Sequence, residues 1–276
     1  MYKYFIIFFI IVVFTANSAI ANDDKVFYSI GVVPQFEARK LHSIWRPILD
    51  YLEKETGYSF ELRGSPSIPE FEREFQEGRF DFAYMNPYHL VMANEKMGYQ
   101  PLIRDHGRKL YGVLVVKKNS NISSPTELNG EKIAFPAPNA LGASLQMRQE
   151  LADNFGIKIT PVYVKTHDSV YLNVLLDKST AGGGVQKTLS QQKSQFRDAL
   201  KVIHTTTKVT PHPFAVLPSV PEKVKVSVTQ ALLKYGQTDE GRKQLAKIPI
   251  KQIGIASLED YMSLKKLGLE RFYVQP

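Results

Sequence analysis

The sequence contains no cysteine. Without cysteine the chain cannot be a disulfide scaffold, a zinc finger, a thiol enzyme or an iron–sulfur protein. General disorder is excluded too, because 43% of the residues are hydrophobic and 22% are charged, as in ordinary globular proteins. Acidic residues are outnumbered by basic ones, which leaves a net charge of +8. This charge favours an anionic partner, but composition alone does not choose among nucleic acid, a membrane and a small anion.

Long hydrophobic runs are missing as well, apart from one at the N-terminus. Residues 5–14 are apolar, they follow Lys3, and they are followed by the small-residue pattern Ala19-Ile20-Ala21. This arrangement predicts a signal peptide, residues 1–21, because a transmembrane helix needs about 20 apolar residues. With no cysteine near the cleavage site to carry a lipid, we expect an unanchored protein in the periplasm. Export also argues against nucleic acid as a partner.

Short β-rich runs alternate with amphipathic helices along the rest of the chain. Expected strands cover residues 26–33, 58–63, 80–84, 112–117, 132–135, 160–164, 199–204 and 214–217. Expected helices cover residues 39–56, 68–77, 87–97, 125–128, 142–155, 169–176, 221–235, 239–246 and 258–267. The alternation predicts an α/β fold with mostly parallel sheets. Because it runs twice, we expect two lobes: lobe 1 from residues 22–116 and 212–276, and lobe 2 from residues 117–211.

Enzyme chemistry finds little support in the sequence. There is no cysteine nucleophile and no G-x-S-x-G motif. His167, Asp168 and Ser169 are consecutive, so their side chains do not converge easily into a triad. The six histidines show no pair at i, i+4 and no cluster. We therefore expect no catalytic activity, no metal site and no cofactor.

Five segments resemble the phosphonate- and phosphite-type periplasmic binding proteins of ABC transporters. Residues 80–88, FDFAYMNPY, are similar to the DFAYxGP segment of that family. Residues 45–52, 128–135, 166–170 and 238–242 resemble further family segments, in the same order and at similar spacing. The resemblance implies a type II periplasmic binding protein fold, in which two α/β lobes joined by a two-strand hinge close over one small anion. It also implies a monomer that delivers its ligand to an ABC permease in the inner membrane.

Helix N-termini supply most of the expected binding site. Their unpaired N–H groups and partial positive charge bind anions without a cationic side chain. Four expected helix starts face the cleft between the lobes, after Gln35, Asn86, Asn139 and His167. Such clefts, beyond the carboxyl ends of strands, are where α/β proteins bind ligands. Tyr84 stands at the end of an expected strand, where its hydroxyl could donate to an oxyanion.

The resemblance adds His167 as a ligand contact, and it also exposes departures from the family. The family's Pro-x-Ser-Thr-Ser-Gly loop is here Pro138–Ser144, which keeps only backbone amides, Asn139 and Ser144 as candidate contacts. His212 stands where relatives that bind amino-phosphonates or phosphite have an acidic residue. Gly182–Gly184 offers either close backbone approach or a flexible turn between strand and helix. These changes argue against 2-aminoethylphosphonate and leave a sulfur or other oxyanion open.

One alternative to transport uses the same clamp. A soluble periplasmic sensor subunit would report an anion to a membrane histidine kinase, with the same binding chemistry. The sequence alone does not separate the two roles, nor does it name the anion.

Overall fold

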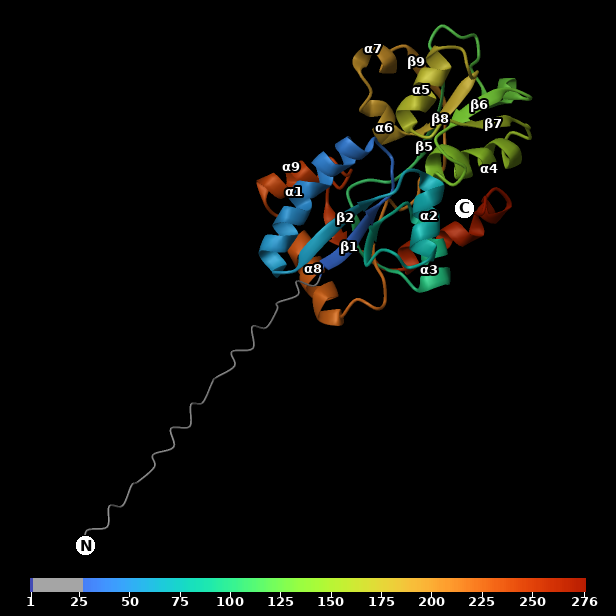
Figure 1. Cartoon of the computed structure of the whole chain (residues 1–276). Coiled ribbons are helices and arrows are strands. Elements are labelled where there is room, and N and C mark those ends of the chain that lie inside the picture. Colours follow the sequence, from blue (N-terminus) through green and yellow to red (C-terminus); the bar gives the residue numbers. More distant parts are fainter. Residues whose placement is uncertain (2–26) are drawn as a thin grey trace.

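The computed structural model describes Met1 and residues 27–276, so the predicted signal peptide lies outside the described residues except for Met1. Two β-sheets with helices packed on them form two lobes (Figure 1). This confirms the predicted α/β fold with two units. No helix among the described residues has both the length and the apolar character needed to cross a membrane.

The first lobe is built on a six-stranded sheet in the order β11-β4-β10-β3-β1-β2. Its strands are β1 (Phe27–Val32), β2 (Ser59–Gly64), β3 (Phe82–Tyr84), β4 (Gln100–Asp105), β10 (Phe214–Val216) and β11 (Ile253–Ile255). Its helices are α1 (Ala38–Thr56), α2 (Ile68–Gln76), α3 (Pro87–Met97), α8 (Glu222–Tyr235), α9 (Asp239–Leu245) and α10 (Glu259–Met262), followed by the 3₁₀ turns η3 (Ser263–Lys266) and η4 (Leu269–Arg271). Strand β10 follows the whole second lobe in the sequence, yet it lies between β3 and β4.

The second lobe is built on a five-stranded sheet in the order β7-β6-β8-β5-β9. Its strands are β5 (Gly112–Lys117), β6 (Lys132–Phe135), β7 (Thr160–Tyr163), β8 (Ala181–Val185) and β9 (Leu200–Thr205). Its helical elements are the 3₁₀ turn η1 (Pro125–Leu128), the π-helical turn η2 (Leu141–Leu145), α4 (Gln146–Asp153), α5 (His167–Leu175), α6 (Gln186–Ser190) and α7 (Ser194–Arg197). Turn η2 runs directly into α4.

The sheets are mixed, so the prediction of mostly parallel pairing is wrong. Strand β1 pairs in parallel with β2 and β3, and β6 pairs in parallel with β7 and β8. The other five pairings are antiparallel. Four of these five involve β10 or β5, which follow the crossings between the lobes and enter their sheets against the direction of their neighbours. The fifth joins the edge strand β11 to β4.

The sheets also divide earlier in the chain than the predicted boundary after residue 116. Strand β5, which ends at Lys117, pairs with β8 and β9 and therefore belongs to the second sheet. The outgoing and returning segments meet just before it, in an antiparallel bridge between Leu110 and Val209. This bridge is the two-stranded connection between the lobes.

Local sequence signals account well for the helices that border the cleft. The Oδ1 atom of Asn86 accepts a hydrogen bond of 2.8 Å from the backbone N–H of His89, and Pro87 occupies the first position of α3. The helix ends at Gly98, which has a left-handed φ of 75°. Glycine adopts this conformation at little cost in free energy. The predicted cap and the predicted span of α3 are both confirmed.

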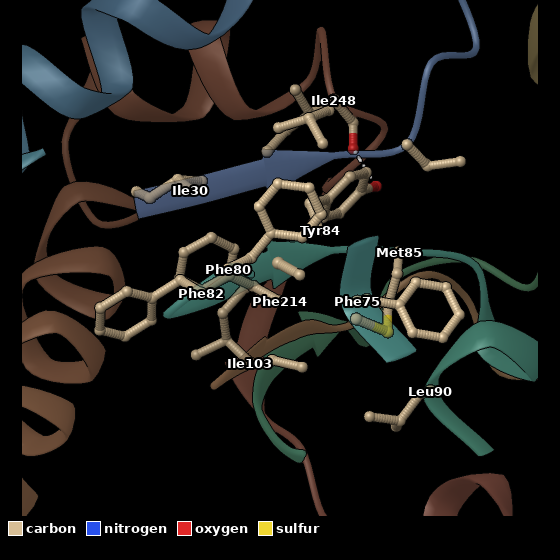
Figure 2. Packing of buried hydrophobic residues seen from close by; sticks show 14 of the residues in the cluster. Ile30, Phe75, Phe80, Phe82, Tyr84, Met85, Leu90, Ile103, Phe214 and Ile248 are labelled. Atoms are coloured by element: carbon tan, nitrogen blue, oxygen red, sulfur yellow. Dashed lines mark hydrogen bonds between the residues drawn. The ribbon is translucent and has the colours of Figure 1, made fainter. Parts of the chain in front are cut away.

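Aromatic side chains fill the core beneath the first sheet. The rings of Phe82 and Phe214 stack with centroids 5.6 Å apart and planes 10° from parallel. Figure 2 shows these rings beside Ile30 of β1 and Tyr84 of β3. Phe82 is fully buried and Phe214 is nearly so, and burial of an aromatic side chain of this size stabilises a fold by roughly 1.5–3 kcal/mol. These rings therefore help to hold β3 and β10 together in the first lobe.

The two lobes share one apolar core, so the structure represents the closed form of the clamp. Leu141, Ala143 and Val185 of the second lobe belong to the same buried cluster as Val33 and Ile68 of the first. The last residues of the chain add a further link. In Figure 1 the red C-terminal part lies beside α2 and α3 of the first lobe and close to α4 of the second.

Contacts of residues 271–274, which we call the C-terminal strap, make that link specific. A guanidinium nitrogen of Arg148, Nη2, donates to the carbonyl of Phe272 over 2.7 Å. Arg271 pairs with Asp153 at the end of α4. The strap therefore joins the first lobe, which it follows in sequence, to the second.

Candidate functional site

Two neighbouring cavities lie between the lobes, and both contain predicted site residues. The inner cavity measures about 20 Å³ and is lined by Val33, Gln35, Ile68, Asn86, Leu110, Ala140, Leu141, Gly142, Ala143, His167, Val185 and His212. The outer cavity measures about 320 Å³. Gln35, Leu110, Val185 and His212 line both, so the two cavities are adjacent.

Three of the four helix starts that the sequence predicted at the cleft converge on the inner cavity. Asn86 precedes α3, residues 140–143 precede α4, and His167 is the first residue of α5. The backbone N–H groups of Leu141, Gly142 and Ala143 have no hydrogen-bond partner within the described part of the chain. Such groups carry the partial positive charge of a helix N-terminus and favour an anion.

His167 is buried and uncharged at the wall of the inner cavity. Its side chain is 2% exposed, and burial lowers the pKa of the imidazole to about 4. Its Nδ1 atom is buried and has no hydrogen-bond partner among the described residues. A buried polar atom without a partner costs about 1–3 kcal/mol. A ligand atom in this cavity would remove that cost.

His212 and Gln35 form a polar pair between the two cavities. The Nε2 atoms of the two side chains lie 3.0 Å apart. Because an amide nitrogen only donates, His212 accepts at Nε2 and carries its proton on Nδ1. Burial, reinforced by repulsion from His89 and His167, lowers the pKa of His212 to about 3. The pair is therefore neutral. It can offer a hydrogen-bond donor or acceptor to a ligand in either cavity.

Tyr84 lines the outer cavity, but its hydroxyl already has a partner. The hydroxyl donates a hydrogen bond of 2.7 Å to the carbonyl of Ile248, drawn as a dashed line in Figure 2. The ring stacks against the ring of His212, with centroids 5.4 Å apart. Burial raises the pKa of the phenol far above its usual range. The residue supports His212 and leaves only its oxygen lone pairs for a ligand.

Asn139 and Ser144 do not line either cavity. Asn139 donates from Nδ2 to Glu72 over 2.9 Å and to the carbonyl of Val274 over 2.6 Å, and its Oδ1 atom accepts from the N–H of Val274. The Oγ atom of Ser144 accepts a bond of 3.2 Å from Arg148. We predicted that these two side chains face the ligand, and the structure places them elsewhere. Asn139 lies in the contact between the lobes, and Ser144 contacts Arg148 of α4.

Asn86 combines a helix cap with a bond between the lobes. While its Oδ1 atom caps α3, its Nδ2 atom donates to the carbonyl of Asn139 over 3.1 Å. Both side chains are buried. Asn86 thus fixes the α3 start and the residue 139 loop in one arrangement around the inner cavity.

The Gly182–Gly184 run is the middle of strand β8, not a turn. A Cβ atom on Gly183 would overlap the carbonyl oxygen of Ala143, and one on Gly184 would overlap the hydroxyl of Tyr171. The run therefore provides the close backbone approach that was one of its two predicted roles. It lets η2 pack directly on β8, next to the inner cavity.

The outer cavity contains cations that the sequence gave no reason to select. Arg108, Lys109 and Lys187 line it, with Asp105 as the one carboxylate among its lining residues in the described part of the chain. Lys187 follows β8, and the carboxyl ends of strands mark ligand sites. Because β8 was not recognised as a strand, this signal was missed.

The family comparison agrees with this geometry. Residues 30–261 match the family described as "ABC transporter, phosphonate, periplasmic substrate-binding protein". The chain belongs to this family. It is therefore a periplasmic substrate-binding protein of the ABC transporter type, and the sensor alternative is not favoured. No curated protein matches the chain in sequence.

Solved structures show that this family member has the expected type II periplasmic binding protein fold. A binding protein component of an ABC phosphonate transporter from Pseudomonas aeruginosa has a TM-score of 0.78 at 15% identity, covering 90% of this chain and 88% of that one. PhnD1 from Prochlorococcus marinus, in complex with methylphosphonate, has a TM-score of 0.80 at 14% identity, covering 89% and 98%. A Xanthomonas citri protein bound to a chloride ion has a TM-score of 0.74 at 17% identity, covering 89% and 98%.

Proposed function

We propose that this family member captures a small phosphonate-like oxyanion between its lobes and hands it to an ABC permease in the inner membrane. The observation that carries the proposal is the buried, neutral His167 with an unpaired Nδ1 atom at a cavity where three helix starts converge. The solved complex of PhnD1 with methylphosphonate supports the same ligand class. The protein acts by binding and release, as a monomer, after removal of the signal peptide at residues 1–21.

A site lined by neutral side chains can bind an oxyanion well. The ionised head group needs hydrogen-bond donors more than it needs a full counter-charge, since backbone N–H groups at helix starts already provide positive potential. Gln35 and His212 supply further donors at the rim of the inner cavity. The inner cavity, which His167 lines, has no carboxylate among the described residues that line it.

Binding must include opening of the clamp. The inner cavity of about 20 Å³ has room for about one water molecule, so the closed form does not admit a phosphonate head group. Leu141 and Ile68 meet there from opposite lobes. Parting of the lobes would enlarge the cavity, and closure on the ligand would restore the apolar contacts around it.

A binding screen of the protein lacking residues 1–21 tests the proposal. Methylphosphonate, phosphite, phosphate, sulfate and thiosulfate would each be added in a thermal-melting experiment, and the hits measured by calorimetry. A ligand at about 100 times its dissociation constant adds roughly 2.7 kcal/mol of stability. We expect methylphosphonate or phosphite to raise the melting temperature most. Stabilisation by sulfate or thiosulfate alone would contradict the phosphonate class while leaving the clamp intact.

A further inference from the structure

The outer cavity concentrates positive charge from both lobes. Arg108 lies in the segment after β4, and Lys187 lies in α6 directly after β8. Both side chains are half-buried. Lys109 also lines the cavity, where three cations face a single carboxylate, that of Asp105.

Asp105 offsets only part of this positive charge. Its Oδ1 atom accepts from the N–H groups of Gly107 and Gln252, over 2.9 Å and 2.7 Å. Its Oδ2 atom forms a long ion pair of 3.9 Å with Nε of Arg108 and has no hydrogen-bond partner among the described residues. Lys187 has no carboxylate within salt-bridge distance among residues 27–276. Burial, together with repulsion from Arg108, lowers the pKa of Lys187.

Two more cations contact aromatic residues that line the outer cavity. The Nζ atom of Lys40 lies 3.7 Å from the ring centre of Phe36, and that of Lys208 lies 5.6 Å from the ring centre of Tyr111. Both rings line the cavity. The cavity thus has an apolar body, positive potential around it, and a volume of about 320 Å³ within the range of small-molecule sites.

We propose that the ligand carries two acidic groups, and that Arg108 and Lys187 bind the second of them in the outer cavity. The first acidic group lies at the inner cavity, which His167, Gln35 and His212 line, as the proposed function requires. A short organic linker then lies against the apolar walls. The chemical class is a carboxyalkyl phosphonate or a similar diacid. An anionic group between two facing cations removes their mutual repulsion, so closure over such a ligand is favoured.

Matched ligands isolate the second acidic group. 3-Phosphonopropionate and propylphosphonate share a phosphonate head and a two-carbon spacer, and they end in a carboxylate or a methyl group. We expect 3-phosphonopropionate to bind roughly tenfold to a hundredfold more tightly in calorimetry, the range of a charge-assisted hydrogen bond. The Lys187→Met substitution should remove most of this difference and Lys187→Arg should retain it. Lys193→Met, an exposed position outside the cavity, changes the net charge equally and should have no effect.

The outcomes separate this inference from the proposed function on which it rests. If propylphosphonate binds as tightly as 3-phosphonopropionate, the second acidic group has no site and the inference fails alone. The same conclusion follows if Lys187→Met and Lys193→Met, both shown to be folded by thermal melting, weaken 3-phosphonopropionate equally. If neither compound nor methylphosphonate binds, the proposed function fails and the inference fails with it.

Discussion

Asn139 of the second lobe donates a hydrogen bond of 2.9 Å to the carboxylate of Glu72 in the first lobe. Both side chains are buried, and the other oxygen of Glu72 lies 2.7 Å from Nε2 of His89. The contact exists only while the lobes are together. It therefore stabilises the closed form. The contact with His89 fixes the carboxylate of Glu72 within the first lobe.

Asn139→Ala should shift the clamp toward its open form. The substitution removes hydrogen bonds to Glu72 and Val274, and a bond to a charged group contributes about 1.5–3 kcal/mol. We expect a larger radius of gyration in solution scattering and a ligand affinity lower by roughly tenfold or more. Asn121→Ala, at an exposed position, is the control. Equal radii for the two variants would show that Asn139 does not act as a latch.

Replacement of His167 should affect binding more than folding. His167→Ala removes the unpaired Nδ1 atom and its burial cost, so stability changes little, while ligand affinity falls by roughly tenfold to a hundredfold. Calorimetry with the best ligand of the screen measures the affinity, and His42→Ala, on an exposed position of α1, serves as the control. Full affinity in the His167 variant would remove this residue from the site.

Stability should decrease as the pH falls from about 6.5 toward 4. The pKa values of His167 and His212 are lowered by burial to about 4 and about 3. In this window the unfolded chain binds protons at these residues and the folded chain does not, so unfolding becomes easier. Each histidine contributes a loss of about 2 kcal/mol between pH 7 and pH 5.

Urea unfolding at pH 7 and pH 5 measures this effect. Comparison with a His167→Gln variant isolates one histidine from all other titrating groups, because the variant should lose less stability between the two pH values. An identical loss in both proteins would mean that His167 is protonated in the folded state.

Gly183→Ala should destabilise the second lobe. The new methyl group would overlap the carbonyl oxygen of Ala143 and lie close to the ring of Phe135, in a strand with no free space. Overpacking of this kind costs about 1–3 kcal/mol. Gly64→Ala is a matched control, because a Cβ atom there meets nothing within 4 Å. Denaturant unfolding of both variants measures the difference, and equal stability would indicate that η2 can move away from β8.

Tyr84→Phe should lower stability and leave affinity nearly unchanged. The variant loses the hydrogen bond to Ile248 and keeps the ring that stacks on His212. The expected cost is about 0.5–1.5 kcal/mol in the free energy of unfolding, with affinity within about twofold. A large loss of affinity at unchanged stability would instead identify the hydroxyl as a ligand contact.

The sequence predicted those parts of the site whose signals are local. Asn86 and Pro87 indicate the start of α3, because helix capping depends only on neighbouring residues. The start of α5 at His167 was located within two residues for the same reason. The convergence of these starts on one cavity follows from the α/β pattern.

Features that depend on distant partners were not predictable in this way. Asn139 meets Glu72 and Val274, which are 67 and 135 positions away in the sequence. Strand β8 has Val185 as its one β-branched residue and no aromatic residue, because its three glycines allow close packing against η2 and Tyr171. The cations of the outer cavity come together only through the fold.

The position of β10 has a consequence for the order in which the protein is made. Its place between β3 and β4 cannot be filled until residue 216 has been synthesised, and the strap cannot close until the last residues have emerged. A nascent chain therefore carries an incomplete central sheet for most of its length. The first lobe can therefore complete its sheet only after the whole of the second lobe has been made.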